Sequence, residues 1–392
     1  MSVNSMTKEQ AYTLINAIHA QATGISAIAP TSTEDFVSVA QATLQAGYEQ
    51  TLNAITQVLG RTLIAVRPYD EKFKGLQMNA ETWGGIIRKI NYADRGAEAD
   101  DVHYTVDGLA VDQFVVRKPL VLETRYVGSD VYQGSYTIYR EQLKTAFENE
   151  SNFGSFMTGL MTHFLNERTQ WLEELKRTIL TNAIAGIYEM NNSDQIVHLL
   201  TEYNTVTGIT PALDNQTVMQ PANFKPFMEW AYSRISEVSR LFTERSQKFQ
   251  QAITGYPIMR HTPVADQRVY MDAKMLEQMD AMVLADTYHD NFLRYADVEA
   301  VSYWQAINNP REVQATPVIL DNTGKIQSGT AQVLSEVVGI MFDRDALGYN
   351  IYNESLDASP YNAKGLYYNL FAHMDVQLQT DYTEKMCIFL LD

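Results

Sequence analysis

The feature that most constrains the fold is a long apolar stripe between residues 152 and 188. Apolar side chains recur there at helical spacing, and no proline interrupts the segment. We expect one continuous helix, on the order of 50 Å long at about 1.5 Å per residue. A loop near Arg168, where a charge interrupts the stripe, would contradict this. The stripe consists of Met157, Leu160, Met161, Phe164, Leu165, Leu172, Leu175, Ile179, Ala183 and Ile187.

Before this helix lies a polar, β-rich segment, residues 61–139, with glycine turns that suggest an extended arm. It has too few apolar residues to pack on its own subunit, so we expect residues 61–126 to project and rest on a neighbouring copy. Positive and negative charges are separated along this segment: basic residues are in excess in its first half, and a run of acidic residues follows. Solvation or electrostatic pairing with a neighbour would explain this sorting equally well. The hypothetical contact residues are Lys72, Lys74, Arg88, Lys89, Asp100 and Asp101.

The rest of the chain divides into further segments by residue composition and hydrophobic pattern. Residues 1–60 should form an arm with a helix: the first thirty or so look mobile, and Thr33 caps one helix that continues to Gly60. Residues 140–200 hold the long helix, 201–316 an α/β lobe, and 317–392 further strands. Pro221 and Pro226 open a helix in the lobe, and a second follows Met271. Strands are expected at 317–321, 337–342, around 374–378 and at 386–391, with a turn at 381–385.

Composition excludes several classes of protein. The 47 acidic and 30 basic residues give a formal charge of −17, which repels phosphate backbones and disfavours a sequence-reading nucleic-acid binder. The single cysteine, Cys387, lies in an apolar run, cannot form an intrachain disulfide and is expected in the core. We find no secretory signal and no apolar run long enough to span a bilayer, so we expect cytoplasmic synthesis and no membrane partner.

The sequence contains no organised catalytic or metal-binding pattern. The histidines are scattered, and there is neither a phosphate-binding glycine loop nor a nucleophile elbow. The acidic groups Asp100-Asp101 and Asp343-Arg-Asp345 could supply a carboxylate pair or a cation site, but solvated loops are the favoured interpretation. We therefore expect no enzyme activity and no cofactor.

The order of these parts resembles one family. An N-terminal arm, an extended loop, a long spine helix, an axial α/β lobe and late peripheral strands together resemble the Hong Kong 97-type major capsid proteins of tailed phages. The likeness is greatest to the shell proteins of short-tailed phages with protein-primed replication, and it covers residue 61 to the C-terminus. The motifs that carry it are Lys72-Phe-Lys-Gly75, Leu143-Lys-Thr-Ala-Phe147, Phe153-Gly-Ser-Phe156, Val269-Tyr-Met-Asp272, Val318-Ile-Leu-Asp321, Phe342-Asp-Arg-Asp345 and Asn362-Ala-Lys-Gly-Leu-Tyr367.

This resemblance implies an α+β fold and a structural role. Many copies would assemble as pentamers and hexamers into an icosahedral or prolate head around double-stranded DNA, with scaffold and portal proteins as partners. The protein would be made in the host cytoplasm and end in the virion. Two alternatives stay open. One is an encapsulin-type nanocompartment with the same fold, and the other is an acidic intracellular hydrolase that uses paired carboxylates.

Overall fold

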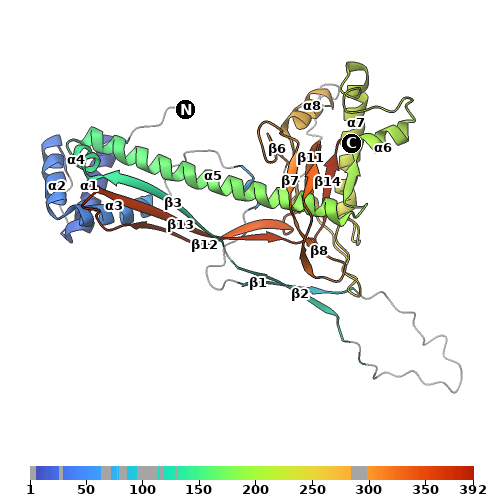
Figure 1. Ribbon diagram of the computed structural model, residues 1–392, viewed down its shortest axis with the longest axis horizontal. Coiled ribbons are helices and arrows are strands. Elements are labelled where there is room, and N and C mark those ends of the chain that lie inside the picture. Colours follow the sequence, from blue (N-terminus) through green and yellow to red (C-terminus); the bar gives the residue numbers. More distant parts are fainter. Residues whose placement is uncertain are drawn as a thin grey trace.

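The computed structural model is an elongated, L-shaped molecule (Figure 1). It describes residues 6–25, 30–62, 72–76, 78, 86–94, 114, 116, 118–128, 130–283 and 298–392. The long helix α5 (Glu150–Met190) runs from a group of short helices at one end to an α/β lobe at the other. A two-stranded hairpin lies beside the junction between α5 and the lobe.

Helix α5 confirms the prediction of one unbroken helix. Asn149 caps its first turn by accepting from the Asn152 N–H, and Asn191 ends it in the left-handed conformation at φ 50°. Its 41 residues correspond to about 60 Å of length. The helix passes Arg168 without interruption because that side chain points outward and pairs with Glu354 on a neighbouring strand.

A three-stranded antiparallel sheet packs along the N-terminal part of α5. Its strand order is β12-β13-β3. Alternate residues of these strands face the helix, and Phe153, Met157 and Leu160 of α5 form an apolar core with Ile138 and Leu370 of the sheet. The strands are β3 (Asp130–Tyr139), β12 (Leu347–Ala358) and β13 (Tyr367–Thr380).

The N-terminal region differs from the prediction. Residues expected to form a mobile arm contain a helix whose Leu14, Ile15 and Ile18 are buried in the core beside α5. The helix expected to continue to Gly60 is broken near Gly47 (φ 123°), and Ser32 rather than Thr33 caps the first half. Because alanine is the commonest residue of the N-terminal stretch and polar residues lie between its apolar ones, the sequence gives only a weak signal for the apolar face of this helix. The helices here are α1 (Lys8–Thr23), α2 (Thr33–Gln45), α3 (Tyr48–Thr62) and α4 (Arg140–Ala146).

The α/β lobe is built on a five-stranded mixed sheet with the order β4-β14-β11-β5-β6. Helices cover one face and the C-terminal end of α5 covers the other. The run 386–391 is therefore buried on both sides: Met386 and Ile388 face α5, whereas Cys387 and Phe389 face the lobe helices. Its elements are β4 (Ile196–His198), α6 (Leu199–Thr207), α7 (Pro221–Thr243), β5 (Gln267–Asp272), α8 (Ala273–Val283), β6 (Val298–Val301), β11 (Val337–Asp343) and β14 (Met386–Leu390).

Short elements connect these parts. A turn at Asn322-Thr-Gly324 joins the strands of a small hairpin, and a second strand pair lies beside α5. Within the described residues, no helix is both long and apolar enough to cross a membrane. The remaining elements are η2 (Lys74–Leu76), η4 (Val264–Asp266), β7 (Val313–Ala315), β8 (Val318–Leu320), β9 (Ile326–Ser328) and β10 (Gln332–Leu334).

Candidate subunit-contact region

The predicted contact residues Arg88 and Lys89 lie on a two-stranded antiparallel hairpin, β1 (Ile86–Tyr92) and β2 (Val121–Val127). Neighbouring residues of a strand point to opposite faces, so these two side chains diverge. Lys72 is half-buried in the segment that precedes the hairpin. The side chain of Lys74 and all of Asp100 and Asp101 lie outside the described residues.

One face of the hairpin lies against the body of its own chain. Lys89 Nζ is 2.6 Å from Asp381 Oδ2 and 2.5 Å from Glu384 Oε1. We expected Lys89 to meet acids of a neighbouring copy, whereas the described partners of its ammonium belong to its own chain. Burial lowers the pKa of Lys89, but the two carboxylates outweigh it and the pKa is raised overall.

The carboxylates respond to burial differently. Burial also raises the pKa of Asp381, but the Lys89 ammonium and hydrogen bonds from Thr383 lower it overall. Burial prevails at Glu384, so its pKa is raised despite nearby Lys89 and Arg260. The three groups thus form a buried ion network that holds opposite charges in fixed positions.

Further polar contacts extend this attachment. Arg260 donates to Asn91 Oδ1 at 2.7 Å on β1, and its guanidinium lies 3.1 Å from Glu384 Oε1. Just beyond β1, the Asp94 carboxylate pairs with Arg245 and accepts the Met259 N–H at 2.8 Å. Polar groups therefore make the specific contacts between the hairpin and its own body.

The turn that receives Lys89 is itself buried. None of the residues 381–385 is more than 7% exposed, although turns normally lie at the surface, where water satisfies their backbone. Lys385 Nζ donates to Glu244 O at 2.7 Å and to Ser246 Oγ at 3.2 Å. Burial lowers the pKa of Lys385 to about 8. Sequence reasoning placed a turn here but missed its role, because a charged turn between strands resembles a solvated loop.

The outer face of the hairpin has no partner among the described residues other than the hairpin itself. Arg88 and Arg125 both pair with Glu123, at 2.6 and 2.8 Å, and their hydrogen bonds lower the pKa of Glu123 to about 2. Beside them Tyr92 is 65% and Val127 68% exposed. This face therefore combines apolar groups with a small charge network and is free to meet another surface.

The segment before the hairpin is anchored in the core, contrary to the expectation that the arm cannot pack on its own subunit. Phe73 is 1% exposed although its φ of 56° is rare for an aromatic residue. The Arg177 guanidinium lies 5.1 Å from the Phe73 ring and 3.8 Å from the Tyr303 ring. The buried Lys176 ammonium donates to Lys72 O at 3.0 Å. Helix α5 thus fixes where the arm begins.

The outward face of α5 between residues 151 and 178 carries little charge. Its most exposed residues recur about every four positions and, apart from His163 and Glu174, they are uncharged. Glu167 and Arg168 are partly exposed beside them, and each is paired within the chain, with His163 and Glu354. Exposed helix faces in an acidic protein normally carry many charges, so this composition is typical of a contact surface rather than a purely solvated one. The uncharged exposed residues are Ser151, Asn152, Ser155, Gly159, Asn166, Gln170 and Thr178.

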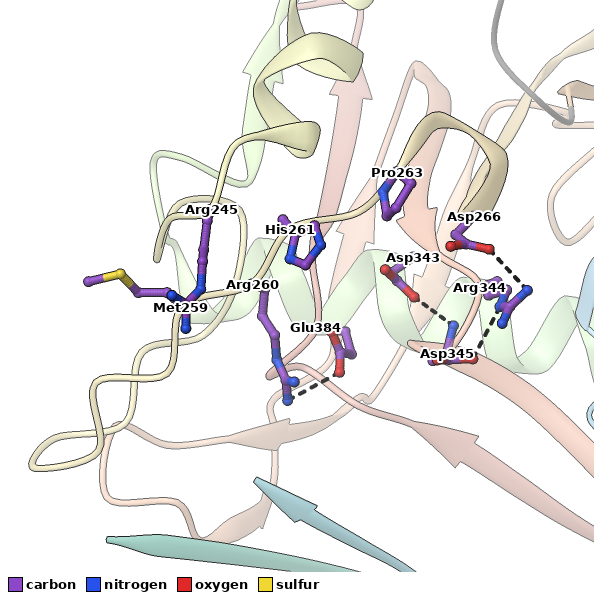
Figure 2. A pocket seen from close by; sticks show the side chains of 10 residues that line it. All are labelled: Arg245, Met259, Arg260, His261, Pro263, Asp266, Asp343, Arg344, Asp345 and Glu384. Atoms are coloured by element: carbon purple, nitrogen blue, oxygen red, sulfur yellow. Dashed lines mark hydrogen bonds and ion pairs between the residues drawn. The ribbon is translucent and has the colours of Figure 1, made fainter. Parts of the chain in front are cut away.

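A polar cavity of about 450 Å³ opens beside the buried turn (Figure 2). Asp343 is one of the acids considered for a carboxylate pair. Its carboxylate accepts hydrogen bonds from the Thr262 hydroxyl at 2.6 Å and from the Asp345 N–H at 2.9 Å. Arg344 pairs with Asp266 at 2.9 Å. These groups hold loops together, and no cluster suited to a metal ion occurs in the described parts of the chain.

The arrangement of spine helix, three-stranded sheet, lobe and hairpin defines a class of protein. It is the Hong Kong 97-type fold of phage capsid subunits. A chain in the capsid structure of Staphylococcus phage Andhra superposes with a TM-score of 0.57 at 10% identity, covering 84% of this chain and 86% of that one. A chain in the structure of the head fiber and inner core protein gp22 of native bacteriophage P68 superposes with a TM-score of 0.55 at 10% sequence identity. This match covers 83% of this chain and 86% of that one.

The sequence then identifies the family. Residues 14–390 match the model of the Phi29-like phage major capsid protein, so the chain belongs to that family. No curated protein matches it. The protein is a structural subunit of a phage shell built from many copies and hence a component of the virion, as the resemblance to short-tailed phage shell proteins implied. The family membership does not favour the encapsulin alternative.

Proposed function

We propose that this subunit forms pentamers and hexamers that close into an icosahedral or prolate head around double-stranded DNA. The observation that carries the proposal is the family match over residues 14–390 in a chain whose hairpin leaves one face uncovered. An acidic wall suits DNA packaging, because it repels phosphates instead of gripping them. Scaffold and portal proteins would complete assembly in the host cytoplasm.

Within the shell, the outer face of the hairpin would rest on α5 of a neighbouring copy. The low charge of the exposed face of α5 supports this pairing, since covering it desolvates few charges. Arg88 at the hairpin and Lys72 and Lys74 at its base would meet acids of the neighbour, while Asp100 and Asp101 would meet its basic groups. Each exposed pair contributes about 0 to 1 kcal/mol, but many copies act together.

The same reasoning argues against catalysis. Buried acids such as Asp343 and Asp381 are committed to structural contacts, and the described pockets are open and polar rather than deep and apolar. We propose that the chain is not an enzyme and needs no cofactor. Several carboxylates line the cavity of Figure 2, but each is engaged by a neighbouring side chain: Asp266 and Asp345 by Arg344, Asp343 by Thr262, and Glu384 by Lys89 and Arg260. A hydrolase would need two carboxylates there that are available to a substrate.

Negative-stain microscopy of the purified protein tests the proposal. Large angular shells are expected. Small closed spheres with a bound cargo protein would support a nanocompartment instead, and a protein that stays monomeric under all assembly conditions would contradict a shell role.

A pair of charge reversals tests the contact between copies. Lys72→Glu with Lys74→Glu should leave a folded subunit with normal helix content that fails to form shells. The matched control reverses Lys325 and Lys364, two exposed lysines on other loops. Unchanged yield and salt tolerance in the Lys72/Lys74 variant would show that these lysines are merely solvated.

A further inference from the structure

The buried turn Asp381–Lys385 lies at a branch point of the molecule. It leaves β13 of the three-stranded sheet and enters β14 of the lobe sheet. The turn also contacts α5, because Tyr382 lies against Gly186, where a Cβ atom would come within 2.1 Å of the Tyr382 hydroxyl oxygen. One short segment therefore touches the sheet, the lobe and the spine helix at once.

The hairpin is held to this turn by polar groups. Its described residues belong to none of the apolar cores, whereas both neighbours of the turn, β13 and β14, are built into them. Lys89 supplies the central contact, with Asp381 and Glu384 on either side of its ammonium. Charge-assisted hydrogen bonds require a short donor–acceptor distance and a favourable angle, so these contacts fix the direction of the hairpin more closely than apolar packing would.

The other side of the same turn holds the lobe. Lys385, which is 0% exposed, donates to the carbonyl of Glu244 at 2.7 Å and lies 3.4 Å from that of Leu241, at the C-terminal end of α7. A cation here satisfies helix carbonyls that have no partner within the helix. Glu384 and Lys385 are adjacent in sequence, so a shift of one moves the other.

We propose that the turn Asp381–Lys385 couples the direction of the hairpin to the position of the axial lobe, so that the two move as one unit. Lys89 connects the hairpin to the turn, and Lys385 connects α7 to it. A shell subunit that occupies non-identical places would then adjust its outgoing arm whenever its lobe tilts. This inference concerns the isolated chain and does not depend on shell formation.

Thermodynamic coupling is reciprocal, which makes the proposal testable. Backbone hydrogen exchange would be measured by mass spectrometry on unassembled full-length chain isolated by gel filtration. Lys89→Met should raise exchange in β1 and β2 and also at the C-terminal turn of α7, which it does not touch. Lys385→Met should do the converse and raise exchange in the hairpin. We expect the exchange rates of these segments to rise tenfold or more. In the double variant Lys89→Met with Lys385→Met, the rise should be smaller than the product of the rises in the two single variants.

Two controls separate coupling from general destabilisation. Arg88→Met changes the adjacent residue on the opposite face and should leave exchange in the α7 turn unchanged. Lys89→Arg, which keeps the positive charge beside Asp381 and Glu384, should retain part of the hairpin protection that Lys89→Met loses. The proposal is overturned if each lysine variant loosens only the element that it contacts, or if exchange rises equally throughout α5, which would indicate global loss of stability.

Discussion

The hairpin and the spine helix are attached to the same subunit by different kinds of interaction: polar contacts hold the hairpin, and apolar burial holds the helix. Helix α5 buries an apolar stripe against two sheets, and its C-terminal part is enclosed by the core on nearly every side. The hairpin has no share in those cores and is held through Lys89, Asn91 and Asp94. Apolar burial gives a shell subunit its rigidity, whereas the polar attachment sets the direction of the hairpin through a few specific hydrogen bonds and ion pairs, without adding to a core.

The largest expected difference concerns apolar truncation. Ile184→Ala in the buried part of α5 should lower the free energy of unfolding by about 2–5 kcal/mol, because a cavity forms where the structure cannot collapse. Ile90→Ala in the hairpin, where the side chain is 52% exposed, should change it by less than about 0.5 kcal/mol. Urea denaturation followed by circular dichroism measures both. Equal losses would remove the contrast between the two regions.

The second prediction concerns the buried ammonium of Lys385. Its pKa of about 8 lies below the ordinary 10.5, so between these values the unfolded chain binds more protons than the folded one. The free energy of unfolding should therefore rise with pH between about 8 and 10.5, by about 3 kcal/mol at most. Below about pH 8 the lysine is protonated in both states, so it should contribute no pH dependence there. Lys385→Met should lack this rise relative to the natural chain. Parallel pH profiles for the two proteins would disprove the shifted pKa.

A third prediction tests how tightly the three-stranded sheet meets α5. A Cβ atom at Gly134 of β3 would come within 2.0 Å of the Trp171 ring. Gly134→Ala should therefore cost about 1–3 kcal/mol by forcing that ring to move. Gly128→Ala is a poor control because its φ of 102° adds strain, whereas Gly159→Ala on the open face of α5 has room. Thermal unfolding should separate the Gly134 and Gly159 variants clearly.

The smallest effect is expected on the outer face of the hairpin. Arg88→Gln removes an exposed ion pair with Glu123 and should change the stability of the isolated subunit by only about 0 to 1 kcal/mol. If this face meets a neighbouring copy, shell yield should fall although unfolding is unchanged. A large loss of subunit stability would mean that the hairpin is part of the core after all.

The site was only partly predictable from sequence. The basic residues of the arm were identified, but Lys89 was assigned to a neighbour, because its partners Asp381 and Glu384 lie 292 and 295 positions away in the chain. Arg88 and Lys89 look equivalent in a charge count. Adjacent residues of a strand face opposite ways, but only the tertiary structure shows that the face with Lys89 lies against Asp381 and Glu384.

By itself the sequence determined what depends on local periodicity and local chemistry: the unbroken α5, the proline-started α7, the strands around Val376 and Ile388, and the acidic character of the wall. Such features follow from spacing along the chain. Only the tertiary structure decided that α1 docks on α5, that Phe73 anchors the arm and that a charged turn is buried. Burial of a charge depends on which distant groups surround it, because an ion leaves water only where opposite charges and hydrogen bonds replace the solvent.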